Sequence, residues 1–332
     1  MRIAVFSAKP YDERFLKAPA ADAGHELVFF AERLTAATAI LAADFDGVCV
    51  FVNDQVDAAV LRTLAKNGLR LLLLRCAGFN NVDLVAAEEL GIGVRRVPAY
   101  SPYAVAEHAL ALILTLNRKT HRAFNRVREG NFSLEGLVGF DIHGSTAGFI
   151  GTGKIGCLTA EPLAAMGCRV LGYDPYPAES FSKIGKYTSL ETLLAESDII
   201  SLHCPLTPAT RHLINRETLK LTKTGVMIIN TSRGGLINTE DLIEALKSGK
   251  VGYVGLDVYE QEADVFFEDL SGEIIQDDVL QRLVTFPNVL ITSHQAFFTE
   301  TAMRNITATT LENIEDFLAG RSSASEVKAK KS

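Results

Sequence analysis

The chain has 332 residues, more than the roughly 250–300 at which a single hydrophobic core stops growing, so we expect two domains. Hydrophobic residues make up 48% and charged residues 22%, a balance that is typical of globular proteins and excludes a disordered chain. The formal charge is −7 and no basic stripe is present, which argues against nucleic acid as a partner.

The cysteines and the apolar stretches indicate a cytoplasmic protein with no membrane partner. The five cysteines are scattered and none forms a CxxC pair, as expected for reduced thiols. Residues 103–116 are the most apolar stretch, but Glu107 and His108 interrupt them and they are too short to span a bilayer. Residues 1–6 are predicted to form a strand and not a signal peptide.

The first hundred residues alternate apolar runs with helical patterns. The helices are predicted at residues 56–66 and 82–90. The strands are predicted at residues 3–7, 47–51, 69–75 and 93–97, with a further strand ending at Phe30. Such alternation is typical of a doubly wound α/β unit, whose parallel strands are covered on both faces.

A long helix is predicted to follow this unit. Ser101 is a favoured cap residue and Pro102 suits the first helical position, and the apolar pattern continues to Arg118. Because this helix is apolar nearly all round, we expect it to be buried, with a place between the two domains. The polar residues 121–136 then form an exposed arm, a part of a dimer interface, or a solvated helix and loop.

A glycine-rich turn stands at the centre of the chain. The apolar run 146–150 reads as a buried strand, and Gly151, Gly153 and Gly156 follow it at GxGxxG spacing before a helical pattern. The first glycine permits a tight turn, the second leaves space for a pyrophosphate, and the third allows close packing of the helix on the sheet. Asp174 closes the next predicted strand, about 20 residues on, where an acid hydrogen-bonds a ribose 2′-hydroxyl. The pattern predicts a dinucleotide site.

The chain beyond Asp174 continues the alternation of strands and helices. Helices are predicted at residues 190–195, 239–248 and 277–283, with a turn and short helix over 210–221. Strands are predicted at residues 198–204, 226–230, 251–256 and 289–292. A second doubly wound unit is therefore expected.

The last predicted helix, residues 299–318, begins after the second unit is complete. We expect it to return to the first unit, which makes the first domain discontinuous: residues 1–100 with 299–332, around a second domain of residues 101–298. The tail, residues 321–332, is small and polar, so we expect it to be frayed.

Three polar residues follow predicted strands of the second unit, namely Arg233, Glu262 and His294. Ligands bind beyond the carboxyl ends of strands in such sheets, so these side chains are expected to converge. A histidine can protonate the alkoxide that forms when a ketone accepts a hydride, and a carboxylate favours the protonated imidazole. An arginine can hold a substrate carboxylate through two hydrogen bonds.

Each of the three residues also has a plainer interpretation. Arg233 precedes two glycines and could be a turn residue, Glu262 lies in an acidic run that is typical of a solvated face, and His294 could be structural. The acidic run lacks the spacing of a calcium loop, so no metal is predicted.

Four motifs in this order resemble the D-isomer-specific 2-hydroxyacid dehydrogenases over nearly the full chain: GTGKIG at 151–156, NTSRGG at 230–235, GLDVYE at 255–260 and SHQAFFT at 293–299. Three further segments resemble the bacterial fermentative D-lactate dehydrogenases of that family: RCAGFNNVD at 75–83, YSPYAVAE at 100–107 and EADVFFED at 262–269. The resemblance implies an α/β protein with two doubly wound parallel-sheet domains. One is a discontinuous flavodoxin-like catalytic domain and the other is a Rossmann domain that binds NAD.

The resemblance also implies roles for individual residues. Arg233 would bind the substrate carboxylate and carbonyl, and Glu262 with His294 would form the acid/base pair. The substrate-binding residues would be Ala77 and Gly78, through their backbone, and Tyr100 and Phe297, which would wall a small side-chain pocket. Besides the three glycines and Asp174, the cofactor contacts would be Lys154, Ile155, Cys204, Pro205, Thr210, Thr231, Ser232 and Asp257.

The implied reaction is the reversible, NADH-dependent reduction of pyruvate to D-lactate by a homodimer or homotetramer. Asp174 favours NAD over NADP because a carboxylate repels a 2′-phosphate. Two alternatives stay open: the same chemistry on another 2-oxo acid, and a non-catalytic protein that senses NADH.

Overall fold

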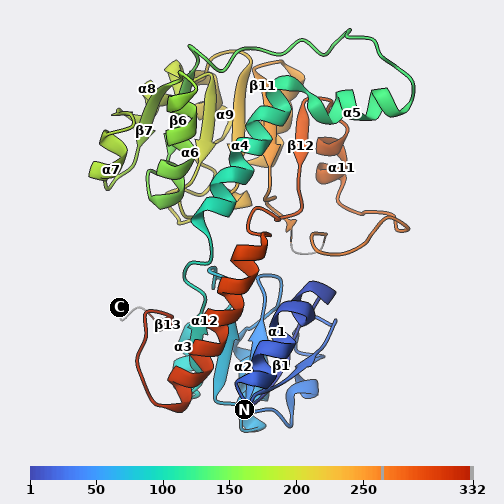
Figure 1. The fold of residues 1–332 in the computed structure, drawn as a ribbon, viewed down its shortest axis with the longest axis vertical. Coiled ribbons are helices and arrows are strands. Elements are labelled where there is room, and N and C mark those ends of the chain that lie inside the picture. The colour runs from blue at the N-terminus through green and yellow to red at the C-terminus, as the bar shows by residue number, and fades with distance from the viewer. Residues whose placement is uncertain (263–264, 330–332) are drawn as a thin grey trace. The chain divides into compact units, whose positions relative to one another are not determined.

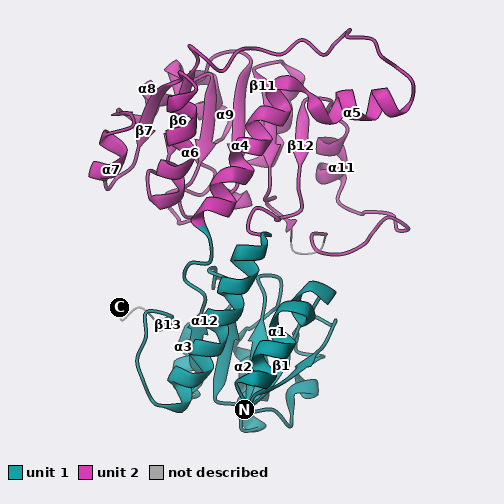
Figure 2. Ribbon diagram, in the orientation of Figure 1, with its two compact units in different colours: residues 1–101, 298–332 teal, residues 102–297 magenta. Residues whose placement is uncertain are grey.

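The structure is a computed structural model, and it describes residues 1–262 and 265–329. The chain divides into two compact units, as Figure 2 shows: unit 1 comprises Met1–Ser101 and Phe298–Ser332, and unit 2 comprises Pro102–Phe297. The two motif residues Ala263 and Asp264 lie outside the described residues.

Unit 1 is built on a six-stranded sheet with the order β13-β5-β4-β3-β1-β2. Figure 1 shows helices α1, α2, α3 and α12 in this unit. All neighbours are parallel except β13, which pairs antiparallel with β5. Its strands are β1 (Arg2–Val5), β2 (Glu26–Phe29), β3 (Gly47–Val50), β4 (Leu71–Leu74), β5 (Gly93–Arg96) and β13 (Glu326–Val327). Its helices are α1 (Pro10–Asp22), η1 (Ala39–Ala42), α2 (Ala58–Lys66), α3 (Leu84–Glu89) and α12 (Glu300–Leu318).

Helix α12 supplies part of the core of unit 1. Its Ile314 is buried in one cluster with residues of β1, β3 and β4, and Leu311 and Phe317 pack against that cluster. Phe317 also lies over Gly93 in β5, where a Cβ atom would meet its ring at 3.1 Å. The C-terminal segment is therefore an integral layer of the unit that contains the N-terminus.

Two features of unit 1 differ from the sequence analysis. Helix α1 was not predicted; it carries Pro19 in its interior, and one of its three buried residues, Asp12, is acidic, so its apolar pattern is weak. The tail was expected to fray, but residues 321–327 return to β5. The Arg95 guanidinium donates to the Arg321 carbonyl at 2.6 Å, and Val327 pairs with Val94.

A buried ionic cluster fixes the carboxyl edge of this sheet. Arg75, which is 2% exposed, follows β4 and donates to the Asp12 carboxylate at 3.1 Å and to the Ser7 carbonyl at 2.9 Å. Asp54 accepts from the Ser7 hydroxyl at 2.6 Å and from the Leu34 amide at 2.7 Å. Arg75 is thus ion-paired with Asp12, and Asp54 is hydrogen-bonded, whereas Nη1 of Arg75 has no hydrogen-bond partner among the described residues.

Unit 2 is built on a seven-stranded, wholly parallel sheet with the order β12-β11-β10-β9-β6-β7-β8. Its strands are β6 (Thr146–Ile150), β7 (Arg169–Tyr173), β8 (Lys186–Tyr187), β9 (Ile199–Leu202), β10 (Val226–Asn230), β11 (Val251–Leu256) and β12 (Val289–Ile291). Its helices are α4 (Pro102–Arg118), α5 (Thr120–Arg128), α6 (Lys154–Ala165), α7 (Glu179–Ser182), α8 (Leu190–Glu196), α9 (Arg216–Leu221), η2 (Gly234–Leu236), α10 (Thr239–Lys247) and α11 (Asp278–Val284).

The central strands β6, β9 and β10 are buried along their whole length, and their successive side chains point to opposite sides of the sheet, where helices cover them. Met227 and Ile229 of β10 pack with residues of α4 and α6. Ile228, between them, packs in a second cluster with residues of α8, α9, α10 and α11. The prediction of two doubly wound parallel sheets is confirmed, apart from the antiparallel edge strand β13.

Helix α5 and the loop after it form an exposed arm of unit 2, residues 120–138. Helix α5 has no buried residue. Phe132, Leu134 and Val138 are 74–81% exposed, so the arm carries large apolar side chains in water. Within the described parts of the chain, no helix combines the length and apolarity that a membrane crossing requires.

Candidate active site and dinucleotide site

The glycine turn lies where the strand order of unit 2 reverses, at the carboxyl ends of the neighbours β6 and β9. Gly151 has φ +95°, and a Cβ atom there would lie 2.5 Å from the Cys204 amide nitrogen. A Cβ at Gly156 would overlap the Gly151 carbonyl oxygen. By contrast, a Cβ at Gly153 would meet no atom within 4 Å. The turn is therefore tight against β9 and open toward the start of α6.

That open side offers backbone donors. Gly153 is the N-cap of α6 and provides no side-chain cap, so the first helical N–H groups, which begin at Lys154 and Ile155, donate no hydrogen bond to a cap side chain. A helix N-terminus with free N–H groups favours a negatively charged phosphate. The residues present fit the pyrophosphate of a dinucleotide.

A cavity of about 370 Å³ adjoins the turn. Gly151 and Asp174 line it, and so do Cys204, Pro205 and Thr210, three of the residues predicted to contact the cofactor. The remaining wall is mainly apolar, as a flat aromatic base requires; it comprises Ile150, Tyr173, Pro175, Tyr176, Thr207, Ala209 and Leu213. Burial raises the pKa of the Cys204 thiol to about 11, so this thiol adds no charge to the cavity near neutral pH.

The loop after β10 carries an unpartnered polar atom. Thr231 is 8% exposed, and its buried hydroxyl has no hydrogen-bond partner among the described residues. Its neighbour Ser232 donates to the Cys204 carbonyl at 2.7 Å, which ties this loop to the wall of the cavity. A buried hydroxyl without a partner is costly in a folded protein, and a bound cofactor would relieve that cost.

His294 and Glu262 form a hydrogen-bonded pair beyond the carboxyl ends of β12 and β11. The His294 Nδ1 lies 2.8 Å from the Glu262 Oε1, and the side chains are 18% and 22% exposed. The other carboxylate oxygen accepts from the Tyr259 amide at 3.0 Å. With Glu262 ionised, Nδ1 carries the proton and donates it, which leaves Nε2 for a substrate.

The backbone of His294 is held in an unusual conformation. Its φ is +50°, in the left-handed region that residues with a Cβ rarely adopt. Asp257, fully buried, accepts from the Gln295 and Ala296 amides at 2.8 Å each, and its carbonyl accepts from the His294 amide at 2.7 Å. Asp257, predicted as a cofactor contact, thus holds the loop that presents the imidazole.

Arg233 lies beyond the end of β10, and β10 is the neighbour of β11 in the sheet. Its guanidinium is half-buried and donates to the carbonyl of Ser232 at 2.6 Å, and it forms no ion pair with any described residue. The Asn230 side chain holds the loop by donating to the Arg233 carbonyl at 2.9 Å. An arginine without an acidic partner at a strand end is suited to bind a ligand carboxylate.

The arginine loop also packs directly on the loop that precedes Glu262. A Cβ atom at Gly234 would overlap the Tyr259 carbonyl group, so only glycine fits there. Glu260 reaches behind the loop to His212 at 2.5 Å and to the Thr239 hydroxyl at 3.1 Å. No sequence pattern predicts a role for His212, because a contact between residues so far apart leaves no local signal.

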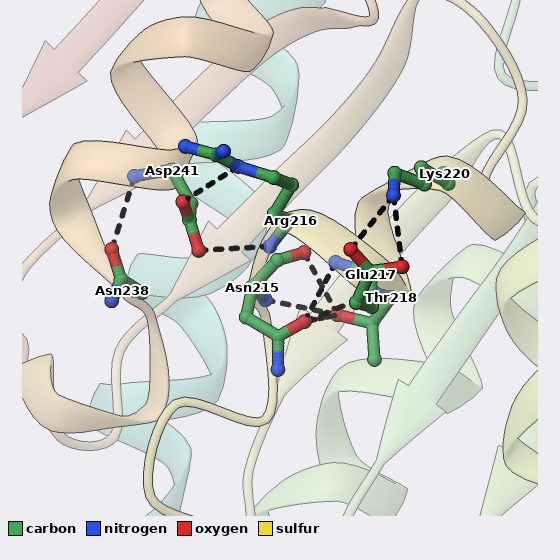
Figure 3. Close-up of polar contacts among 7 residues, drawn as sticks. All are labelled: Asn215, Arg216, Glu217, Thr218, Lys220, Asn238 and Asp241. Carbon is green, nitrogen blue, oxygen red and sulfur yellow. Dashed lines mark hydrogen bonds and ion pairs between the residues drawn. The ribbon is translucent and has the colours of Figure 1, made fainter.

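The helix starts behind this loop are capped and tied to each other, as Figure 3 shows. Asn215 caps α9 by accepting from the Glu217 amide at 2.9 Å, and Asn238 caps α10 by accepting from the Asp241 amide at 3.0 Å. Asp241 in turn accepts from the Arg216 amide at 2.9 Å. Since α10 begins directly after η2, these bonds anchor the segment that follows Arg233.

The remaining predicted residues lie in separate units. Ala77, Gly78 and Tyr100 belong to unit 1, and Phe297, which is 8% exposed, belongs to unit 2. The carbonyl of Ala77 accepts from Arg96 at 2.6 Å, whereas the Ala77 and Gly78 N–H groups have no partner among the described residues. These two amides are therefore available to a ligand.

Within the described residues no group of three or more His, Cys, Asp or Glu side chains could hold a metal ion. The described residues bring a hydrogen-bonded His–Glu pair, a half-buried arginine and a cavity beside the glycine turn to one parallel sheet.

Comparisons with known proteins agree with this chemistry. Residues 110–296 match the family of the D-isomer specific 2-hydroxyacid dehydrogenase, NAD binding domain. The chain is 56% identical to 2-hydroxyacid dehydrogenase A of Aspergillus oryzae, covering 97% of this chain and 93% of that protein. It is 52% identical to D-lactate dehydrogenase of Escherichia coli, over 98% of this chain and 100% of that protein. The pyruvate reductase structure of Chlamydomonas reinhardtii has a TM-score of 0.93 and 45% identity, covering 98% of each chain.

Proposed function

Because this chain belongs to the D-isomer-specific 2-hydroxyacid dehydrogenase family and carries its NAD-binding domain, we propose that it reduces pyruvate to D-lactate with NADH, reversibly. The observation that carries this proposal is the hydrogen bond of 2.8 Å between His294 Nδ1 and Glu262 Oε1, at the sheet edge where Arg233 forms no ion pair with any described residue. Two relatives at this level of similarity are named for D-lactate and pyruvate, which supports the choice of substrate.

The proton and the carboxylate are handled by residues of this chain. Arg233 binds the 2-oxo acid carboxylate through parallel hydrogen bonds and so orients the carbonyl. His294, as the imidazolium, donates its Nε2 proton to the carbonyl oxygen as that oxygen becomes an alkoxide. Glu262 stabilises the imidazolium and fixes the ring through Nδ1. NADH, when bound, supplies the hydride.

In the reverse direction the same atoms act in the opposite order. Neutral His294 accepts the hydroxyl proton at Nε2 while the hydride leaves the substrate carbon. The roles of Ala77 and Gly78 as backbone donors, and of Tyr100 and Phe297 as walls of a small pocket, complete the proposed substrate site. Five free cysteines suit the reducing environment of the cytoplasm.

The exposed arm, residues 120–138, suggests that the working form is a homodimer or homotetramer. Its apolar side chains, Phe124, Phe132, Leu134 and Val138, are 61–81% exposed, and exposed clusters of this kind mark contact surfaces. Light scattering should give a multiple of the 36.0 kDa chain mass. A double variant, Phe132→Ser with Leu134→Ser, should shift the protein toward the monomer.

The test of substrate is a direct comparison of 2-oxo acids. NADH oxidation is followed with pyruvate, glyoxylate, 2-oxoisocaproate and 3-phosphohydroxypyruvate, and the chirality of the product is determined. We expect pyruvate to give the largest kcat/KM and D-lactate to be the product. A larger kcat/KM with another acid would replace pyruvate within the same mechanism. NADH binding without turnover would favour the sensor alternative.

A further inference from the structure

The carboxylate of Asp174 is held in place by the protein itself. Its Oδ2 accepts from the Thr152 amide at 2.8 Å and from the Thr152 hydroxyl at 3.3 Å, and its Oδ1 accepts from the Tyr176 amide at 2.9 Å. A carboxylate offers about four lone-pair sites, so these bonds leave about one, on Oδ1. The direction of that remaining acceptor depends on how firmly Thr152 holds the carboxylate.

Thr152 is itself oriented by Tyr187. The two hydroxyl oxygens lie 2.7 Å apart, and the Tyr187 oxygen also accepts from the Ala178 amide at 2.8 Å. The Tyr187 hydroxyl has two acceptors within reach, the Thr152 oxygen at 2.7 Å and the Ala178 carbonyl at 3.3 Å, and the shorter contact selects one arrangement of protons. The Ala178 amide donates to Tyr187, the Tyr187 hydroxyl donates to Thr152, and the Thr152 hydroxyl donates to Asp174. Thr152 is only 1% exposed, so water would not readily replace a lost partner.

Tyr187 stands on a rigid support. It lies in β8 and pairs with Gly172 of β7, the strand that ends just before Asp174. Its ring is 5.2 Å from the ring of Phe181, which is fully buried and packs on Gly172. The phenol therefore links three segments: the glycine turn at Thr152, the loop of residues 174–178, and the edge strand.

We propose that Tyr187 is a positioning residue for cofactor selection. Through Thr152, its hydroxyl keeps Asp174 in the orientation that accepts a ribose 2′-hydroxyl and repels a 2′-phosphate. The inference rests on the proposed contact of Asp174 with the ribose, and it adds a residue that does not itself touch the cofactor.

The test is Tyr187→Phe, which keeps the ring and removes only the hydroxyl. Since the chain contains no tryptophan, NADH and NADPH binding are followed by the fluorescence of the bound nicotinamide itself, without any 2-oxo acid. The Kd for NADH should rise about threefold to tenfold, as for one lost hydrogen bond, while the Kd for NADPH should not rise, because the loss of this orientation removes no favourable contact with a 2′-phosphate. At saturating NADH, kcat should equal that of the parent protein.

The matched control is Tyr253→Phe. Tyr253 is a half-buried tyrosine of β11 in the same unit, and its ring packs 5.7 Å from that of Phe140. It should leave both Kd values unchanged. Thr152→Val removes the next hydrogen bond of the same chain, the one from the Thr152 hydroxyl to Asp174. This variant replaces Tyr187→Phe in the test if Tyr187→Phe does not fold. When the two changes are combined, the loss of NADH affinity should equal that of Thr152→Val alone, because both act on one path.

An unchanged ratio of the NADPH and NADH dissociation constants in Tyr187→Phe would overturn the inference. Fully additive losses of NADH affinity when Tyr187→Phe and Thr152→Val are combined would also overturn it. Asp174→Ala separates this failure from failure of the cofactor assignment. If Asp174→Ala weakens the binding of NADH while Tyr187→Phe does not, only the role of Tyr187 is wrong. If Asp174→Ala also binds NADH normally, the ribose contact itself is wrong.

Discussion

The Nδ1 of His294 lies 2.8 Å from the Oε1 of Glu262, although the two residues follow different strands. The histidine adopts a φ of +50° to reach this place, and Asp257 holds the backbone on both sides of it. Strained backbone of this kind is maintained where the surrounding bonds over-determine it.

We expect His294→Ala to lower kcat by about 10²–10⁴, the usual contribution of general acid–base catalysis, and to leave NADH binding intact. Glu262→Gln should lower kcat as well, because a neutral amide does not favour the imidazolium. Steady-state rates and NADH titrations check both variants. A His294→Ala protein with near-normal turnover would remove this residue from the mechanism.

Arg233→Lys should raise KM for pyruvate and lower kcat together. A lysine keeps the charge but loses the two parallel hydrogen bonds that orient the carbonyl. Loss of one bond to a charged group costs about 1.5–3 kcal/mol, so kcat/KM should fall about 10- to 100-fold or more. Arg211→Lys, an exposed arginine 3.8 Å from Glu260, is the control, and its kcat/KM should change little. Equal kcat/KM values for Arg233→Lys and Arg211→Lys would contradict the proposal that Arg233 binds the substrate carboxylate.

Asp174→Ala should weaken NADH binding by about 10- to 100-fold, which is the range for loss of a hydrogen bond to a charged group. The variant should also reduce the ratio of its affinity for NADH to its affinity for NADPH. The reason is that the carboxylate both accepts the 2′-hydroxyl and repels a 2′-phosphate. Titration with each cofactor measures the effect. Unchanged NADH affinity with an unchanged preference would show that the acid after β7 does not meet the ribose.

Asp12→Asn should destabilise unit 1 by about 3–5 kcal/mol, since it leaves the buried Arg75 guanidinium without its ion-pair partner. Glu13→Gln is the matched control on the next residue. Glu13 pairs with Lys17 in water, and exposed pairs contribute about 0–1 kcal/mol. Urea unfolding of both variants decides the matter. Similar midpoints for the two would mean that the buried pair contributes no more than the surface pair.

His203 should make the protein less stable in mild acid. Burial lowers the pKa of this histidine to about 4, whereas the unfolded chain takes up its proton near 6.5. The unfolded state therefore binds more protons as the pH falls from about 6.5 to 4, and the free energy of unfolding should drop by up to about 3 kcal/mol. His203→Asn should flatten this slope between those pH values. If the free energy of unfolding falls with pH equally steeply in both proteins, groups other than His203 cause the acid sensitivity.

The sequence predicted the parallel sheets well because their signals are local. Pro102 and Arg118 bound helix α4, as expected from the cap residues and the apolar pattern, and residues 146–150 form β6. Strand ends also placed Arg233, Glu262 and His294 on one sheet edge, since the carboxyl ends of parallel strands lie together.

What the sequence could not predict depends on contacts between distant residues. Strand β13 has two residues and forms only because Val94 and Arg95 offer an open edge. The bond between Glu260 and His212 joins two positions that carry no shared motif. The Tyr187–Thr152 contact is similar, because Tyr187 lies in a two-residue strand that no periodicity reveals.

The position of α12 has a consequence for synthesis on the ribosome. All of unit 2 has been made by residue 297, whereas the first sheet lacks the helix that supplies Ile314 to its core until α12 emerges. At about 5–20 residues per second, the N-terminal segment waits roughly 10–40 s for that partner after its own strands are complete. The central unit is thus able to fold first, and the segment made earliest is the one whose sheet waits longest for one of its covering helices.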